Sequence, residues 1–233
     1  MPRTKSAPAP LSADALLATL RQLGKPSAAA IYRRHGAAGE VWGVSFADLA
    51  ALAKRIKTDH ALARSLWASR VVDAQTLALM VADPAALTPA AAGRWLRESR
   101  APVLLHYLAL LVARTDFAAD LAAAWAKSPD DFTRTAGYSL LGALLVNGSL
   151  TDAACRKSLA QIEKTIHASP NRARHAMNMA VIAIGVHKPA LEQDAIAAAR
   201  RIGKVQVDHG ETGCKTPDAE AYIRKATARR SRR

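Results

Sequence analysis

The sequence consists of a long succession of segments with helical periodicity, joined by short turns. In residues 45–56, for example, apolar side chains recur at steps of three and four, and Ser45 stands where it can cap the first turn. The connections carry turn-forming pairs such as Asp83-Pro84 and Asn147-Gly148. Helices are predicted at about residues 12–23, 27–35, 45–56, 60–69, 73–82, 88–99, 102–114, 116–127, 130–146, 151–167, 171–186 and 189–202, and a last one is predicted with Pro217 at its first position.

Consecutive helices of similar length with short connections favour antiparallel pairs stacked in order along the chain. Alanine, the strongest helix former, supplies 53 of the 233 residues, and valine and isoleucine never gather in alternating runs. Two helices occupy about 40 residues, which matches the HEAT or armadillo period. We therefore predict an all-α fold, a right-handed α-solenoid of HEAT-like antiparallel helix pairs. A compact helical bundle is the alternative.

We expect one folded domain with two short flanking segments. Residues 1–10 have the composition of a flexible arm, residues 11–225 form the solenoid, and residues 226–233 form a basic tail. The sequence shows no signal peptide and no membrane-spanning run, and its two cysteines imply no disulfide framework. A cytoplasmic monomer without membrane association is expected.

The charge of the chain indicates a polyanionic partner. The formal net charge is +14, with 22 arginines and 11 lysines, and residues 224–233 contain six of these cations and no acid. Such a surplus favours nucleic acid, and a basic tail adds phosphate affinity that is independent of sequence. A genome rich in codons for alanine and arginine, or a tail that only improves solubility, would give the same counts.

The segment 171–185 carries a polar stripe on an otherwise apolar helix. Asn171, Arg174 and Asn178 follow at steps of three and four, and Arg172 and His175 flank them. Two arginines in the first helical turn oppose the helix dipole, so a bound phosphate would relieve the conflict. These five residues are therefore DNA-binding candidates. The alternative is an exposed helix end with a buried asparagine that bonds a neighbouring turn.

Two further groups of residues have both a functional and a structural interpretation. Arg134 is a candidate phosphate contact, although an ion pair with the preceding Asp130 and Asp131 would also explain it. Trp95 and Glu98 belong to a cluster of basic and aromatic residues, and a core tryptophan beside a solvated charged face would give the same pattern.

The glycine-rich segment 203–215 interrupts the helical pattern. Asp208, His209 and Cys214 match no familiar zinc spacing, so neither a metal nor another cofactor is expected. Lys204 and Lys215 are candidate DNA contacts, because the segment can form a loop near a phosphate; a tight packing corner is the alternative.

Several segments together resemble the DNA alkylation repair family of AlkD-like DNA glycosylases. The resemblance rests, in chain order, on 32–56, the Leu66-Trp67 pair, 125–145, 171–185 and the string 207–219. It implies a curved HEAT-like array whose positive concave face holds duplex DNA, alkylated or not. In the family, purine bases alkylated at N3 or N7 are released from DNA without being flipped out of the duplex. Tryptophans contact the lesion, and an aspartate stabilises the developing sugar cation.

This sequence departs from the family pattern at the catalytic positions. If Trp95 matches the family's tryptophan, Ser99 replaces the aspartate and Glu98 lies one position short. The second tryptophan is replaced by Met179 or Asn178, whereas the family's arginine is retained as Arg134. Trp95 and Glu98 are therefore the catalytic candidates, and the scaffold carries over more safely than the catalysis.

The sequence leaves three functions open. The first is a DNA-binding protein of the alkylation repair type, including a glycosylase for cationic alkylated purines. The second is a non-catalytic HEAT-like binder of structured DNA, and the third is a protein-interaction solenoid. Steep loss of affinity with salt would separate the two DNA-binding functions from the third.

Overall fold

The computed structural model describes residues 12–230, which form thirteen α-helices and three short 3₁₀ helices. Within this part of the chain there is no β-strand, and no helix is long and apolar enough to cross a membrane. The α-helices are α1 (Ala13–Leu23), α2 (Pro26–Arg34), α3 (Phe46–Ile56), α4 (His60–Ala68), α5 (Val72–Val81), α6 (Pro89–Glu98), α7 (Pro102–Val112), α8 (Ala118–Trp125), α9 (Asp131–Val146), α10 (Asp152–Thr165), α11 (Asn171–His187), α12 (Glu192–Ile202) and α13 (Ala219–Arg230). The 3₁₀ helices are Pro84–Ala86, Ile166–Ala168 and Pro189–Leu191.

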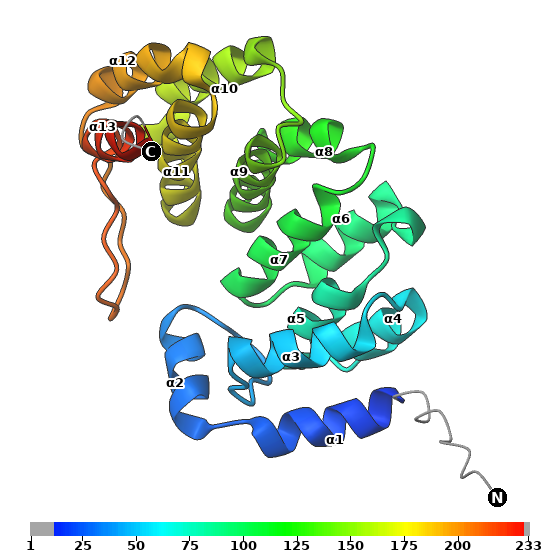
Figure 1. Cartoon of the computed structure of the whole chain (residues 1–233). Coiled ribbons are helices and arrows are strands. Elements are labelled where there is room, and N and C mark those ends of the chain that lie inside the picture. The colour runs from blue at the N-terminus through cyan, green and yellow to red at the C-terminus, as the bar shows by residue number, and fades with distance from the viewer. Residues whose placement is uncertain (1–11, 231–233) are drawn as a thin grey trace, which may run out of the picture.

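The helices form two layers that curve into a C-shaped arc (Figure 1). The inner layer stacks α3, α5, α7, α9, α11 and α13 in chain order, each packed on the next. The outer layer contains α4, α6, α8, α10 and α12. A short connection leads from each of the first four to the next inner helix, whereas the longer segment 203–218 leads from α12 to α13. This confirms the predicted all-α solenoid of HEAT-like pairs over the alternative of a compact bundle.

Side-chain caps set where most of the predicted helices begin. Ser12, Ser45 and Asp130 each accept a hydrogen bond from the backbone N–H three residues on, which satisfies a free donor of the first turn. The last helix departs from the prediction. Asp218 Oδ1 accepts from Ala221 N at 2.8 Å, so Asp218 caps α13 and Pro217 lies before the helix.

The structure describes only part of the two flanking segments that the sequence predicts, and the part it describes differs from the prediction. Residues 226–230 belong to α13 and are not an extended tail, because the helix continues to Arg230 with Thr227 buried against Glu192 of α12. The predicted arm at 1–10 and residues 231–233 lie outside the described residues.

The apolar core consists of two clusters that share α9. One cluster extends from Leu16 to α9, where it includes Leu140 and Leu144. The other begins with Tyr138 and Leu141 of the same helix and continues to α13. Neighbouring residues of α9 thus belong to different clusters, and this helix connects the two halves of the solenoid.

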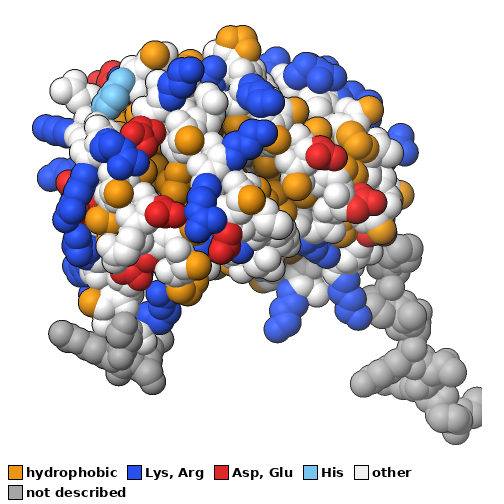
Figure 2. Space-filling model, turned by 90° about the horizontal axis from the view of Figure 1, so that it is seen from above, with side chains coloured by type: hydrophobic (Ala, Val, Ile, Leu, Met, Phe, Trp, Pro, Cys, Tyr) orange, Lys and Arg blue, Asp and Glu red, His pale blue; other side chains and the backbone are white. Residues whose placement is uncertain are grey.

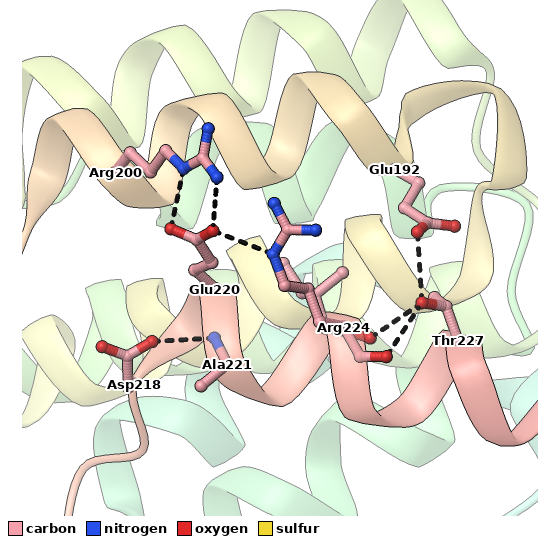
Figure 3. A network of polar contacts seen from close by, with 8 residues as sticks. Glu192, Arg200, Asp218, Glu220, Ala221, Arg224 and Thr227 are labelled. Atoms are coloured by element: carbon pink, nitrogen blue, oxygen red, sulfur yellow. Dashed lines mark hydrogen bonds and ion pairs between the residues drawn. The ribbon is translucent and has the colours of Figure 1, made fainter.

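Polar contacts hold the last helix against its neighbours (Figure 3). Glu220 of α13 accepts two hydrogen bonds from Arg200 of α12, at 2.9 and 2.8 Å, and one from Arg224 at 2.9 Å. These bonds lower the pKa of the Glu220 carboxyl to about 2. On its other side α13 approaches α11, where a Cβ on Gly185 would lie 2.8 Å from Ile223. The end of the solenoid is therefore closed by a packed and ion-paired helix.

Candidate nucleic-acid interface

Three consecutive inner helices, α7, α9 and α11, enclose a groove on the face that the outer layer leaves free. Its cavity has a volume of about 470 Å³, and no aspartate or glutamate lines it. The floor exposes the large apolar side chains Leu110, Val146 and Met179. The polar lining residues are His106, Thr135, Tyr138, Ser139, Asn147, Arg172 and His175.

A smaller cavity of about 210 Å³ adjoins this groove and shares Arg172 and His175 with it. It brings together the end of α2, the start of α11 and the extended segment 203–218, which lie far apart in sequence. Arg34 and Arg172 line it, with Asp208 as its acidic residue. We refer to the two cavities together as the inner groove.

Arg172 occupies the junction between these elements. Its guanidinium lies 5.5 Å from the ring centroid of Phe132 in α9, within the range of a cation–π contact. A Cβ on Gly36 would lie 2.8 Å from Arg172 Nη2, so the glycine lets the loop after α2 approach this guanidinium. Arg172 forms no ion pair within the described residues. Its charge remains available to an anion in the groove.

The polar stripe of α11 anchors the segment 203–218. Asn171 Nδ2 donates to Asp208 O at 2.7 Å, and Asn171 Oδ1 accepts from Asp208 N at 2.8 Å. Asn178 is buried and donates from Nδ2 to Pro217 O at 2.9 Å. The structural interpretation, an asparagine that bonds a neighbouring segment, thus describes Asn178 and also Asn171.

Two histidines extend this anchor. His175 Nδ1 lies 3.3 Å and His209 Nε2 lies 2.9 Å from the Thr216 hydroxyl, and the two rings meet edge to face at 5.3 Å. Burial, together with the nearby His209 and Arg172, lowers the pKa of His175. The neutral imidazole is therefore the form that the folded groove favours.

Arg134 has a structural partner different from the predicted ones. Its Nε donates to Ser128 O at 2.6 Å and its Nη1 to Ser169 Oγ at 2.8 Å, so the guanidinium ties the two loops that precede α9 and α11. Asp131 instead accepts from the backbone N–H groups of Arg172 and Ala173, at 3.2 and 2.7 Å. The carboxylate of α9 thus caps α11, which offsets the two arginines in that first turn.

The remaining cationic candidates differ in accessibility. Arg174 Nη2 lies 3.4 Å from Asn171 Oδ1, while its buried Nε has no partner among the described residues. Lys204 and Lys215 are exposed on the segment 203–218 and line neither cavity of the inner groove. No cluster of three or more possible metal ligands occurs among the described residues.

Trp95 and Glu98 lie on α6 in the outer layer, away from the inner groove. Trp95 is 4% exposed and stacks on Trp67 at a centroid distance of 4.8 Å. Trp67 Nε1 donates to Glu98 Oε2 at 2.6 Å. The structure brings the two catalytic candidates together, but around a separate cavity between α4 and α6.

Sequence reasoning missed several residues of the inner groove. His106, Leu110 and Tyr138 lie on the free face of α7 and α9, and Arg34 lies at the end of α2. The spacing of four between His106 and Leu110 marks one helical face, but the sequence does not reveal that this face is uncovered.

Some basic residues on the outside of the arc pair with neighbouring acids. Viewed from above, Lys and Arg side chains are spread over the surface with Asp and Glu among them (Figure 2). Arg156 pairs with Asp194, Arg200 with Glu220, and Arg201 with Glu163. Arg34 and Arg172 of the inner groove form no such pair within residues 12–230.

An all-α arc of HEAT-like pairs with an acid-poor basic groove on its inner side defines a solenoid of the nucleic-acid-binding type. The chain belongs to the DNA alkylation repair enzyme family, whose model matches residues 16–223.

Similar proteins cover nearly the full length. Two uncharacterised proteins, Lin0241 of Listeria innocua and Lmo0209 of Listeria monocytogenes, are each 32% identical over 223 residues, covering 93% of this chain and 97% of theirs. A solved structure superposes with a TM-score of 0.87 at 28% identity and 94% coverage of both chains. It is described as a new family of proteins related to the HEAT-like repeat DNA glycosylases, with affinity for branched DNA structures.

Proposed function

We propose that this protein binds DNA in the inner groove and prefers branched DNA to a continuous duplex. The observation that carries the proposal is the lining of that groove: Arg34 and Arg172, which form no ion pair within residues 12–230, line its smaller cavity, and no carboxylate lines the larger one. Phosphate oxygens are the natural partners of free guanidinium groups.

The apolar floor supports the preference for branched DNA. Leu110 is 43% and Met179 36% exposed there, among alanines and one glycine. A continuous duplex presents phosphates and groove edges, whereas a branch point also exposes base faces that have lost a stacking neighbour. Aromatic base faces gain from contact with an apolar surface. The solved relative with affinity for branched DNA has the same fold over nearly the whole chain.

The test compares a four-way junction with a linear duplex of equal length and base composition. Dissociation constants are measured for the full chain by fluorescence anisotropy at several salt concentrations. We expect tighter binding of the junction and a steep loss of affinity with salt, because released counterions make phosphate contacts salt-dependent. Equal affinity for both DNAs would remove the preference for branched DNA, and a flat salt response would remove the DNA-binding proposal itself.

The family match supports a second candidate, excision of cationic alkylated purines. The larger cavity of the inner groove offers no carboxylate to stabilise an oxocarbenium-like sugar, and Glu98 lies in the outer layer bonded to Trp67. Release of N7-methylguanine from duplex DNA by the pure protein is the direct measurement. Release above the spontaneous rate would support a glycosylase, and Glu98→Gln would then show whether this carboxylate takes part.

A further inference from the structure

A separate cavity lies in the outer layer between α4 and α6 and shares no lining residue with the inner groove. Its volume is about 640 Å³, which falls within the range of small-molecule sites. The lining residues are His60, Arg64, Trp67, Ala68, Arg70, Gln75, Ala86, Ala91, Arg94, Trp95, Glu98 and Arg100.

Four guanidinium groups surround this cavity, with Glu98 as its one lining carboxylate. Arg64, Arg70 and Arg94 are exposed and form no ion pair with any residue of 12–230. Arg100 donates from Nη1 to the carbonyls of Arg97 and Ser99, at 2.8 and 3.0 Å. Like charges around one concavity repel each other, so a bound anion would stabilise the arrangement.

The wall of the cavity combines aromatic rings with polar atoms that have bonding capacity left. His60, Trp95 and Trp67 stack in a row, at centroid distances of 6.1 and 4.8 Å. Glu98 uses Oε2 to accept from Trp67, while Oε1 has no hydrogen bond to a described residue. His60 Nδ1 is buried without a partner in the described chain. Glu98 Oε1 therefore remains free to bond a ligand in this cavity.

The backbone at the edge of the cavity is held in an uncommon conformation. Arg70 has a φ of 60°, in the left-handed region that side chains other than glycine rarely adopt. Its N–H donates to Trp67 O at 3.2 Å, which fixes the turn that leads from α4 into α5. Such strain often marks a residue whose position serves a site.

We propose that this cavity is a nucleotide-binding site. The arginines at the rim take the phosphate, whose oxygens match the planar fork of a guanidinium. Glu98 Oε1 accepts from an exocyclic amine of the base, and Trp67 and Trp95, which line the cavity although they are largely buried, contribute apolar atoms beside it. The ligand is either a free nucleotide or the phosphorylated 5′ end of a DNA strand, because both present a phosphate beside a base.

The experiment titrates the full-length protein with adenosine 5′-monophosphate, and separately with a short single strand that carries either a 5′ phosphate or a 5′ hydroxyl. Binding is followed by calorimetry and by the near-ultraviolet circular dichroism of the Trp67–Trp95 stack. We expect saturable binding that depends on the phosphate. Binding of the mononucleotide assigns a free nucleotide, and binding of only the phosphorylated strand assigns a DNA end. No saturable binding of either overturns the proposal.

Variants locate the site and separate it from the proposed function. Arg64→Ala combined with Arg94→Ala should weaken binding at least tenfold, whereas Arg97→Ala, an exposed arginine of the same helix that does not line the cavity, should leave it unchanged. Arg172→Ala in the inner groove should not affect the nucleotide. Equal affinity of the double variant and the native chain would place the nucleotide elsewhere and refute the assignment.

Discussion

The side chain of Asn171 pairs with the backbone of Asp208 as one strand pairs with another, donating at 2.7 Å and accepting at 2.8 Å. A single residue at the start of α11 thus holds Asp208, in the middle of the extended segment 203–218, by two hydrogen bonds. The rim of the inner groove on this side is fixed by side chains of α11.

Asn171→Ala should loosen the segment 203–218 while leaving the solenoid folded. Two hydrogen bonds are lost, each worth about 0.5–1.5 kcal/mol. Hydrogen exchange of peptides covering 203–218 should accelerate, and exchange in α9 should not. Gln206→Ala, which removes an exposed amide of the same segment, serves as the control. Unchanged exchange in the Asn171 variant would show that the segment is held by other contacts.

Arg172→Ala should weaken junction DNA binding by about tenfold, as expected for a charge-assisted phosphate contact. The slope of log affinity against log salt should become shallower by about one phosphate equivalent. Arg114→Ala is the matched control, because Arg114 is an exposed arginine that follows the C-terminal end of α7 and lines neither cavity of the inner groove. An equal loss in both variants would indicate a general effect of charge and not a contact in the groove.

Acidification should release the same rim. The folded-state pKa of His175 lies below the ordinary value of 6.5, so the unfolded chain takes up the proton first. The stabilising contribution is complete above about pH 6.5 and is lost as the pH falls from there toward the folded pKa. Protease cleavage within 203–218 should therefore be faster at about pH 5.5 than at about pH 7.5. His175→Gln should flatten this dependence, and a profile that stays equally steep would exclude His175 as its origin.

Two glycines of α9 should respond in opposite directions to alanine. A Cβ on Gly137 would lie 2.3 Å from the backbone N of Ala126, whereas nothing lies within 4 Å of one on Gly142. Gly137→Ala should cost about 1–3 kcal/mol or more, because backbone has to move. Gly142→Ala should raise the free energy of unfolding by as much as about 1 kcal/mol, because alanine has the higher helix propensity. Urea unfolding of the two variants measures both, and equal midpoints would contradict the close approach of α8 and α9.

Glu220→Gln should weaken the attachment of α13 at neutral pH. The contribution of the carboxylate is present above about pH 4.5 and is lost as the pH falls toward the folded pKa of about 2. The difference in urea midpoint between the native chain and the variant should therefore shrink over that interval. Asp14→Asn in α1, an exposed acid outside the network of Figure 3, provides the comparison.

The order and boundaries of the helices could be predicted from local signals, because Ser45 and Asp130 cap helices wherever they precede an amphipathic run. The site could be predicted only in part. Arg172 and His175 do line the groove, whereas Trp95 and Glu98 lie in the outer layer. Which face of a helix remains uncovered depends on the curvature of the stack, and local periodicity carries no information about curvature.

Local sequence patterns also do not predict the hydrogen-bond partners of individual polar residues. Arg134 and Asp131 are near neighbours in sequence, yet Arg134 bonds Ser169 and Asp131 caps α11. Both partners lie more than thirty residues away and become adjacent only when α9 and α11 pack. An ion pair inside one helix was the nearest explanation that the sequence offered.

The sharing of α9 between the two apolar clusters has a mechanical consequence. Each half has its own packed interior, so we expect that a small rotation of the halves about this helix would leave both interiors closed. The loop after α2 and the segment 203–218 line the smaller cavity from opposite halves, so we expect the distance between them to change with that rotation. We expect the arc to open and close elastically at this place, and the close approach of Arg172 and Gly36 sets the width of the gap in the structure described.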